Sequence, residues 1–212
     1  MKAANPISPV AGPVIALDIG NVSMKLTFDA MYRRLDVDPA DSAAVAGLWE
    51  HGAALETGRC TVPEFLDRLD DFTGHRHSRQ YLLDAWRCGV RESMPGMADT
   101  VRALTARGVR FSYMSDISPI HLDQVFKYCE FSHLVTGGVY SFEVGALKMD
   151  DCVMLDAFEE RYGRPAAFFD DRELVLAFRA LVEANRAIVS SGGNARIALE
   201  LLTIRIAGGA AA

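Results

Sequence analysis

Short apolar runs alternate along this chain with longer stretches in which apolar residues recur every three or four positions. This alternation is typical of an α/β protein, because the buried strands of a parallel sheet are short and apolar whereas the helices that cover it expose one face. Four of the runs end in a polar residue, which favours buried strands whose carboxyl ends carry chemistry. Strands are predicted at residues 14–18, 109–115, 134–139, 166–170 and 186–190.

Helix signals lie between these runs. Helices are expected directly after Ser118 and over residues 96–107 and 151–162, where apolar positions recur with helical spacing. Thr61 and Glu64 form a helix-start pattern that precedes an apolar stripe. The helices and strands together indicate a Rossmann-like core.

The first two predicted strands are separated by roughly 90 residues without a convincing strand, far more than the ~30 residues of a strand–helix–strand unit. We expect residues 21–91 to form a helical cap inserted after the first strand. Residues 14–20 and 92–206 are expected to form the core, a Rossmann-like, mainly parallel sheet with helices on both faces. The ends, residues 1–13 and 207–212, are rich in small residues or proline and are expected to be flexible.

Composition narrows the functional classes. The 212 residues are 50% apolar and 24% charged, enough for one domain or a core domain with an insertion. The net charge of −6 and the absence of a basic stripe argue against nucleic acid as a partner. No apolar run in the sequence approaches the ~20 residues of a membrane span, and no signal peptide is recognised. The four cysteines form no CxxC pair, which favours reduced thiols and a cytoplasmic location.

Three polar residues follow predicted strands. Asp18 ends the first strand, where a carboxylate either faces a ligand at the edge of the sheet or only caps the loop. Ser115 ends the second, where a hydroxyl and free backbone N–H groups can cradle a phosphate, unless Ser115 or Ser118 is only a helix cap. Lys148 follows the third strand and either neutralises phosphate charge or is a solvated surface lysine.

Two adjacent carboxylates, Asp170 and Asp171, close the fourth apolar strand. Such a pair is costly at the end of a buried strand unless a cation binds it, and carboxylate oxygens favour Mg²⁺. A helix N-cap explains one of the two carboxylates but explains a pair less well.

The order of these residues along the chain resembles the haloacid dehalogenase (HAD) superfamily of phosphohydrolases and dehalogenases. The resemblance covers about residues 14–190 and implies that Asp18 is a covalent nucleophile. It implies that the substrate is bound by Ser115, Asp116 and Lys148. It also implies that Mg²⁺ is held by Asp18, the Gly20 carbonyl, Asp170 and Asp171.

One branch of the superfamily is more similar than the rest. The segment Leu17-Asp-Ile-Gly-Asn-Val22 resembles the branch that includes α-D-glucose-1-phosphate phosphatase. The cap segment that runs from Glu56 to Phe65 and the segment Gly145-Ala-Leu-Lys148 resemble the same branch.

Several positions depart from the superfamily pattern. Gly20 stands where most phosphatases of the superfamily carry an aspartate that acts as acid and base. Asp116 replaces a common asparagine and Met149 a usual proline, and Val175 lies where a polar residue normally supports the metal. Without a carboxylate at position 20 another residue must supply the proton, and His51 of the expected cap is the first candidate.

The leading hypothesis is a Mg²⁺-dependent phosphatase that hydrolyses a small phosphorylated metabolite through an aspartyl-phosphate on Asp18. One alternative is a HAD-fold binding or regulatory protein that has lost turnover, as the departures suggest. Another is a metal-free haloacid dehalogenase, which the acidic pair disfavours. A membrane partner is not expected, and the substrate and the oligomeric state stay open. The substrate would be selected in the expected cap, where the candidates are Trp49, His51, Arg59, Tyr81 and Trp86.

Overall fold

A computed structural model of the chain describes residues 12–169. Asp170, Asp171, the predicted strand at 186–190 and most of the two expected flexible ends lie outside this described part. The fold and the site below belong to the compact unit that ends at Phe168.

The core of this unit is a four-stranded sheet in the order β5-β4-β1-β6. β1 pairs in parallel with β4, and β4 pairs in parallel with β5. The four strands match four of the five predicted ones to within one residue at each end; they are β1 (Val14–Leu17), β4 (Arg110–Ser115), β5 (Val135–Tyr140) and β6 (Ala167–Phe169). The expected α/β architecture with a mainly parallel sheet is therefore confirmed.

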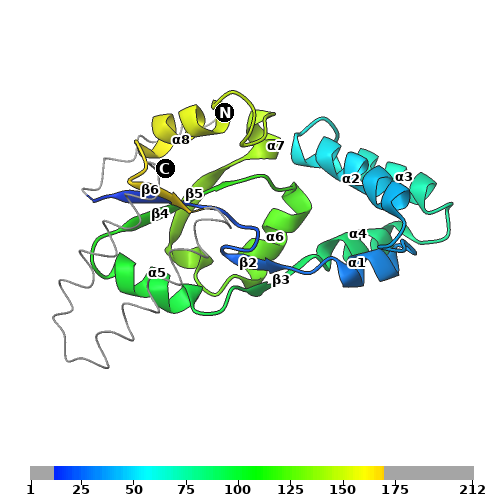
Figure 1. The fold of residues 1–212 in the computed structure, drawn as a ribbon, viewed down its shortest axis with the longest axis horizontal. Coiled ribbons are helices and arrows are strands. Elements are labelled where there is room, and N and C mark those ends of the chain that lie inside the picture. The colour runs from blue at the N-terminus through cyan, green and yellow to red at the C-terminus, as the bar shows by residue number, and fades with distance from the viewer. Residues whose placement is uncertain (1–11, 170–212) are drawn as a thin grey trace. The chain divides into compact units, whose positions relative to one another are not determined.

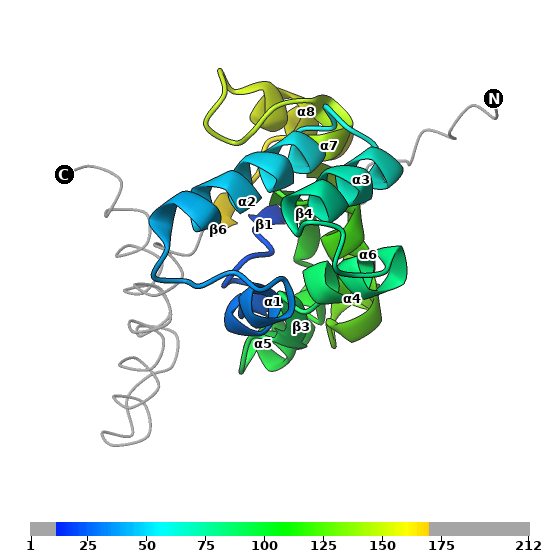
Figure 2. The ribbon, with the colours of Figure 1, turned by 90° about the vertical axis from the view of Figure 1, so that its right-hand side faces the viewer.

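Helices cover both faces of the sheet. Figures 1 and 2 show α5 (Met97–Thr105) on one face and α8 (Val153–Tyr162) on the other. β4 is followed along the chain by α6 (Pro119–Tyr128). A 3₁₀ turn, Ser132–Leu134, then precedes β5, and β5 is followed by α7 (Ser141–Val144). The apolar cluster under α8 is formed by Val14, Ala16, Met114, Val139, Met154 and Phe158.

Four helices lie within residues 21–91, between β1 and α5. They are α1 (Asp29–Arg34), α2 (Ser42–Glu56), α3 (Val62–Phe72) and α4 (Arg79–Arg87). The helix-start pattern at Thr61 and Glu64 is a complete capping box at the start of α3. None of the helices in the described part is both long and apolar enough to cross a bilayer.

The expectation that this segment contains no strand is wrong. β2 (Met24–Leu26) and β3 (Val90–Ser93) pair as an antiparallel ribbon that joins the two ends of the helical segment. Lys25 and Glu92 form an exposed ion pair across the ribbon, with 3.4 Å between Nζ and Oε2. Strands of three and four residues with charged positions carry too short an alternation for the sequence pattern to show.

The helical segment has its own apolar cluster around the fully buried Trp86. The indole is edge-on to Phe65, with 4.8 Å between ring centroids. Ile120 of α6 belongs to the same cluster, and the His121 ring stacks on Trp86. Packing thus joins the helical segment to the core through α6.

A second contact joins the segment to the core at the end of α2. Gly58 has a left-handed backbone with φ of +65°, and a Cβ there would lie 2.4 Å from the Phe142 carbonyl oxygen of α7. Only glycine allows both this conformation and this approach. The turn after Glu56 is therefore held directly against the core.

Gly58→Ala is expected to destabilise the protein by more than the 1–2 kcal/mol, roughly, that a left-handed alanine costs. Gly74→Ala is the matched control, because Gly74 has a φ of +66° and no atom within 4 Å of its Cβ position. Urea unfolding measures both variants, and the difference between them reports the clash with Phe142. Equal losses of stability would contradict the close contact.

Candidate active site at the edge of the sheet

Asp18, directly after β1, is buried and accepts hydrogen bonds on both carboxylate oxygens. Oδ1 accepts the Ser115 hydroxyl at 2.8 Å and the backbone N–H of Ile19 at 2.7 Å. Oδ2 is ion-paired with Nζ of Lys148. The structure therefore brings together three of the predicted site residues, Asp18, Ser115 and Lys148.

The topology explains this convergence. β1 and β4 are parallel neighbours, so Asp18 and Ser115 at their carboxyl ends reach the same edge of the sheet. β5 is the next strand, and α7 and the loop after it return Lys148 to that edge.

Two carboxylates fasten the loop that carries Lys148. Asp116 Oδ1 accepts the backbone N–H of Lys148 at 2.9 Å, and Asp150 Oδ2 accepts that of Leu147 at 2.9 Å. Met149, in place of the usual proline, is almost fully exposed. The departure at Asp116 therefore has a structural role, because its side chain holds the lysine loop through a backbone N–H.

The loop after Asp18 turns at Asn21. Asn21 has a φ of +53°, and its Oδ1 accepts the backbone N–H of Leu26 at 3.2 Å. Gly20 is not in the left-handed region, and a Cβ there would lie 3.0 Å from Cδ1 of Leu26. Gly20 thus provides close packing and places no side chain beside Asp18.

The expectation of free backbone N–H groups after Ser115 is wrong for Ile117, whose N–H is donated to the Ser141 hydroxyl at 3.0 Å. Ser118 is the N-cap of α6 and accepts the backbone N–H of His121 at 3.2 Å. The helix-cap interpretation therefore holds for Ser118, whereas the Ser115 hydroxyl donates to Asp18.

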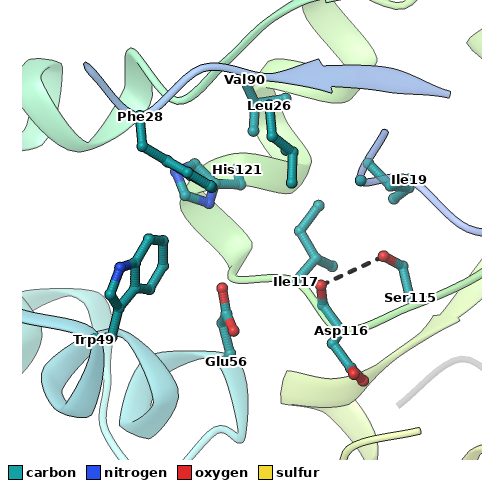
Figure 3. A pocket seen from close by; sticks show the side chains of 11 residues that line it. Ile19, Leu26, Phe28, Trp49, Glu56, Val90, Ser115, Asp116, Ile117 and His121 are labelled. Carbon is teal, nitrogen blue, oxygen red and sulfur yellow. Dashed lines mark hydrogen bonds between the residues drawn. The ribbon is translucent and has the colours of Figure 1, made fainter. Parts of the chain in front are cut away.

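A cavity of about 60 Å³ lies between this edge of the sheet and the helical segment. Figure 3 shows the Glu56 side chain pointing into it from α2, across from Ser115 and Asp116. Aromatic and aliphatic side chains form the rest of its wall. The lining residues are Ile19, Gly20, Leu26, Phe28, Trp49, Glu56, Val90, Ser115, Asp116, Ile117 and His121.

Comparisons with known proteins bear on this architecture. No protein-family model matches the chain, and no curated protein matches it. Among solved structures, a HAD family enzyme from Bacteroides thetaiotaomicron has a TM-score of 0.66 at 18% identity, over 76% of this chain and 84% of that one. This chain has the HAD fold.

Two further solved structures are similar to this chain in fold. The wild-type enzyme from Bacteroides thetaiotaomicron in complex with magnesium and inorganic phosphate has a TM-score of 0.58 at 16% identity, covering 73% of this chain and 80% of that one. A predicted HAD-like family hydrolase from Porphyromonas gingivalis has a TM-score of 0.55 at 20% identity, covering 70% and 76%. The resemblance to the superfamily is confirmed as a fold, while the glucose-1-phosphate phosphatase branch stays a prediction.

Oxygen atoms that could bind a metal ion lie at this edge of the sheet. Asp18 and the Gly20 carbonyl lie within the described part and are hard oxygen donors of the kind that Mg²⁺ prefers. In residues 12–169 no three His, Cys, Asp or Glu side chains gather into a metal site. The donors present therefore fit Mg²⁺ in type, and Asp170 and Asp171, the other ligands predicted from the sequence, lie outside the described residues.

Glu56 is a site residue that the sequence reasoning did not select. Burial raises its pKa from an ordinary value of 4.5 to about 7, and the negative charge of Asp116 adds to this effect. Burial likewise raises the pKa of Asp116, opposed by the backbone N–H and the charge of Lys148. Burial lowers the pKa of His121 to about 4, so this ring is neutral at pH 7.

The residues selected from the sequence as candidates for substrate selection lie in different places. Trp49 lines the cavity, and Trp86 is a core residue of the helical segment. His51 and Arg59 line a different hollow, beside Glu50 and Arg68. His51 is not among the residues that line the cavity beside Ser115, whereas Glu56 of the same helix lines it.

The raised pKa of Glu56 makes stability depend on pH. The folded protein keeps the Glu56 proton up to about pH 7, whereas the unfolded chain loses it near pH 4.5. The folded state therefore binds more protons between these values, and the free energy of unfolding falls as pH rises through them.

Glu56→Gln removes the free-energy cost of ionising a buried carboxyl group in the folded protein. We expect the variant to be more stable than the wild type above pH 7, by at most about 3 kcal/mol, and the difference to vanish below about pH 4.5. Urea unfolding across this pH range measures it. Glu50→Gln is the control, since Glu50 lies exposed on the same helix. A difference that does not depend on pH would contradict the raised pKa.

Proposed function

We propose that this protein is a Mg²⁺-dependent HAD-type phosphatase that hydrolyses a small phosphorylated metabolite through an aspartyl-phosphate on Asp18. The observation that carries the proposal is the Asp18 carboxylate, held between the Ser115 hydroxyl and the Lys148 ammonium at the carboxyl edge of a parallel sheet. A nucleophile, a hydroxyl donor and a cation at one place suit phosphoryl transfer. In the proposal the protein is cytoplasmic.

In this mechanism Asp18 attacks phosphorus, and the phosphoryl group is then transferred from Asp18 to water. The Ser115 hydroxyl and the Ile19 N–H fix the orientation of the carboxylate, so attack requires little rearrangement. Lys148 offsets the repulsion between the carboxylate and the phosphoryl oxygens. Asp116 is among the residues that line the cavity, and it positions Lys148 through its loop.

Mg²⁺, when bound, would neutralise phosphoryl charge, and its proposed ligands are Asp18, the Gly20 carbonyl, Asp170 and Asp171. A solved structure with this fold contains both magnesium and inorganic phosphate, which supports the choice of metal and of substrate class.

The proposal assigns residues 21–91 to a cap and residues 14–20 with 92–206 to the core. The cavity between the described parts of the two is small and mostly apolar, which favours a small leaving group.

A binding protein without turnover is the second candidate, because Gly20 provides no acid or base beside Asp18. A haloacid dehalogenase would share the Asp18 nucleophile. Hydrolysis of a panel of phosphate esters with Mg²⁺ or EDTA, together with chloride release from 2-chloropropionate in EDTA, separates the three. Phosphate release that depends on Mg²⁺ supports the phosphatase.

Asp18→Asn is expected to abolish hydrolysis, because an amide does not attack phosphorus. The fold should persist with a loss of stability below about 3 kcal/mol, since the unpaired ammonium of Lys148 keeps some contact with water. Phosphate release and circular dichroism measure the two effects. Asp123→Asn, an exposed change on α6, is the control. Near-wild-type activity in Asp18→Asn would remove Asp18 from the nucleophile role.

Mg²⁺ at millimolar concentration is expected to raise the melting temperature, because a ligand of the folded state stabilises it by RT ln(1 + [L]/Kd). Asp170→Asn and Asp171→Asn should each reduce this gain, whereas Asp99→Asn, exposed on α5, should not. Differential scanning fluorimetry measures the shift. No shift in the wild type would count against the metal site.

A further inference from the structure

Hydrolysis through Asp18 requires a proton for the leaving group and a base for the attacking water. Gly20 supplies neither, so we compare the titratable residues that line the same cavity as Gly20. Three side chains that titrate line it: Glu56, Asp116 and His121. Their contacts differ enough to separate them.

His121 is not available as the donor. Its Nε2 lies 2.9 Å from the Trp86 carbonyl oxygen, which only accepts, so Nε2 carries the hydrogen and donates it there. The ring is buried and stacked on Trp86. Burial lowers its pKa to about 4, so Nδ1 holds no proton at pH 7.

Asp116 is engaged by the lysine loop. Burial raises the pKa of Asp116, but its Oδ1 accepts the Lys148 N–H, and this hydrogen bond and the charge of Lys148 oppose the rise. Protonation would weaken the contact that positions Lys148. Asp116 is therefore better suited to hold the loop than to exchange protons.

Glu56 has the position and the freedom that the role requires. It is the last residue of α2, and the close approach of Gly58 to Phe142 fixes the turn that follows it. Its side chain points into the cavity from the side opposite Ser115 (Figure 3). Within residues 12–169 its carboxyl forms no hydrogen bond or ion pair, so both oxygens are free to meet a substrate and a water.

The wall around Glu56 is apolar on the side of the helical segment. Trp49 lies seven residues earlier on α2, which is about two helical turns and hence the same face, and its ring is edge-on to Phe28 with 4.8 Å between centroids. Water-poor surroundings favour the neutral carboxyl. The resulting pKa of about 7 suits a group that both gives and takes a proton at neutral pH.

We infer that Glu56 is the general acid and base of this active site, supplied from the helical segment in place of the side chain that Gly20 lacks. The inference rests on the proposed phosphatase function.

In the first step a bond forms between an Asp18 oxygen and phosphorus, the bond from phosphorus to the leaving oxygen breaks, and the Glu56 carboxyl protonates that oxygen. In the second step the Glu56 carboxylate takes a proton from water, whose oxygen bonds to phosphorus. The bond from phosphorus to Asp18 then breaks. Phosphate leaves, and Asp18 and Glu56 return to their initial forms.

Glu56→Gln tests the inference, because glutamine keeps the shape and exchanges no proton. With Mg²⁺ and an alkyl phosphate, kcat should fall by about 10²–10⁴-fold. With p-nitrophenyl phosphate the leaving group needs no acid, so the first step should survive while the second becomes slow. We expect one nitrophenolate per enzyme in a burst, and a phosphorylated Asp18 detected by mass spectrometry after acid quench.

The controls separate this inference from the proposed function. Glu50→Gln should behave as the wild type, and Glu56→Asp should recover part of the alkyl-phosphate activity. An active wild type with an unchanged kcat in Glu56→Gln would overturn the role of Glu56 alone. A raised KM without a burst or a loss of kcat would also overturn it and assign Glu56 to substrate binding. A wild type inactive on every phosphate ester with Mg²⁺ would overturn the proposed function and the inference together.

Discussion

The partly buried ion pair between Asp18 and Lys148 is the contact on which the rest of the site depends. A carboxylate at the edge of an apolar sheet is costly unless a cation and hydrogen-bond donors compensate it. Lys148 and Ser115 provide both, from segments far apart in the sequence. The lysine must therefore be held in place, and the Asp116 contact with its backbone N–H does so. The need to hold the Lys148 loop explains why a negative residue, Asp116, stands beside the proposed phosphate site.

The helical segment is attached to the core at separate places, and this sets the geometry of the cavity. The β2–β3 ribbon closes its ends, Trp86 packs it against α6, and Gly58 holds the end of α2 against α7. Contacts at several points restrict rotation of α2 more than one linker does. Glu56 therefore has a defined position over the edge of the sheet, although it belongs to a different element from Asp18.

The sequence predicts the parts of this structure that depend on local pattern. Four strands follow from apolar runs, and the capping box follows from the spacing of Thr61 and Glu64. The meeting of Asp18 with Ser115 and Lys148 follows from the resemblance to the HAD superfamily. The β2–β3 ribbon is not predicted, because its strands are very short. Glu56 is not predicted as a site residue, because its raised pKa comes from burial and from Asp116, 60 residues later. A helical-face argument could have found it, since Trp49 shares its face while His51 lies about 140° away.

Under the proposed role of Glu56, proton transfer depends on where α2 lies relative to the edge of the sheet. The proposed acid and base lies on α2, whereas the proposed nucleophile Asp18 follows β1. The raised pKa of Glu56 depends on burial first and on the charge of Asp116 second. If α2 moved away, Glu56 would enter water and lose its proton at neutral pH. Closure would then both position the acid and protonate it, so that proton transfer is confined to a site from which bulk water is excluded.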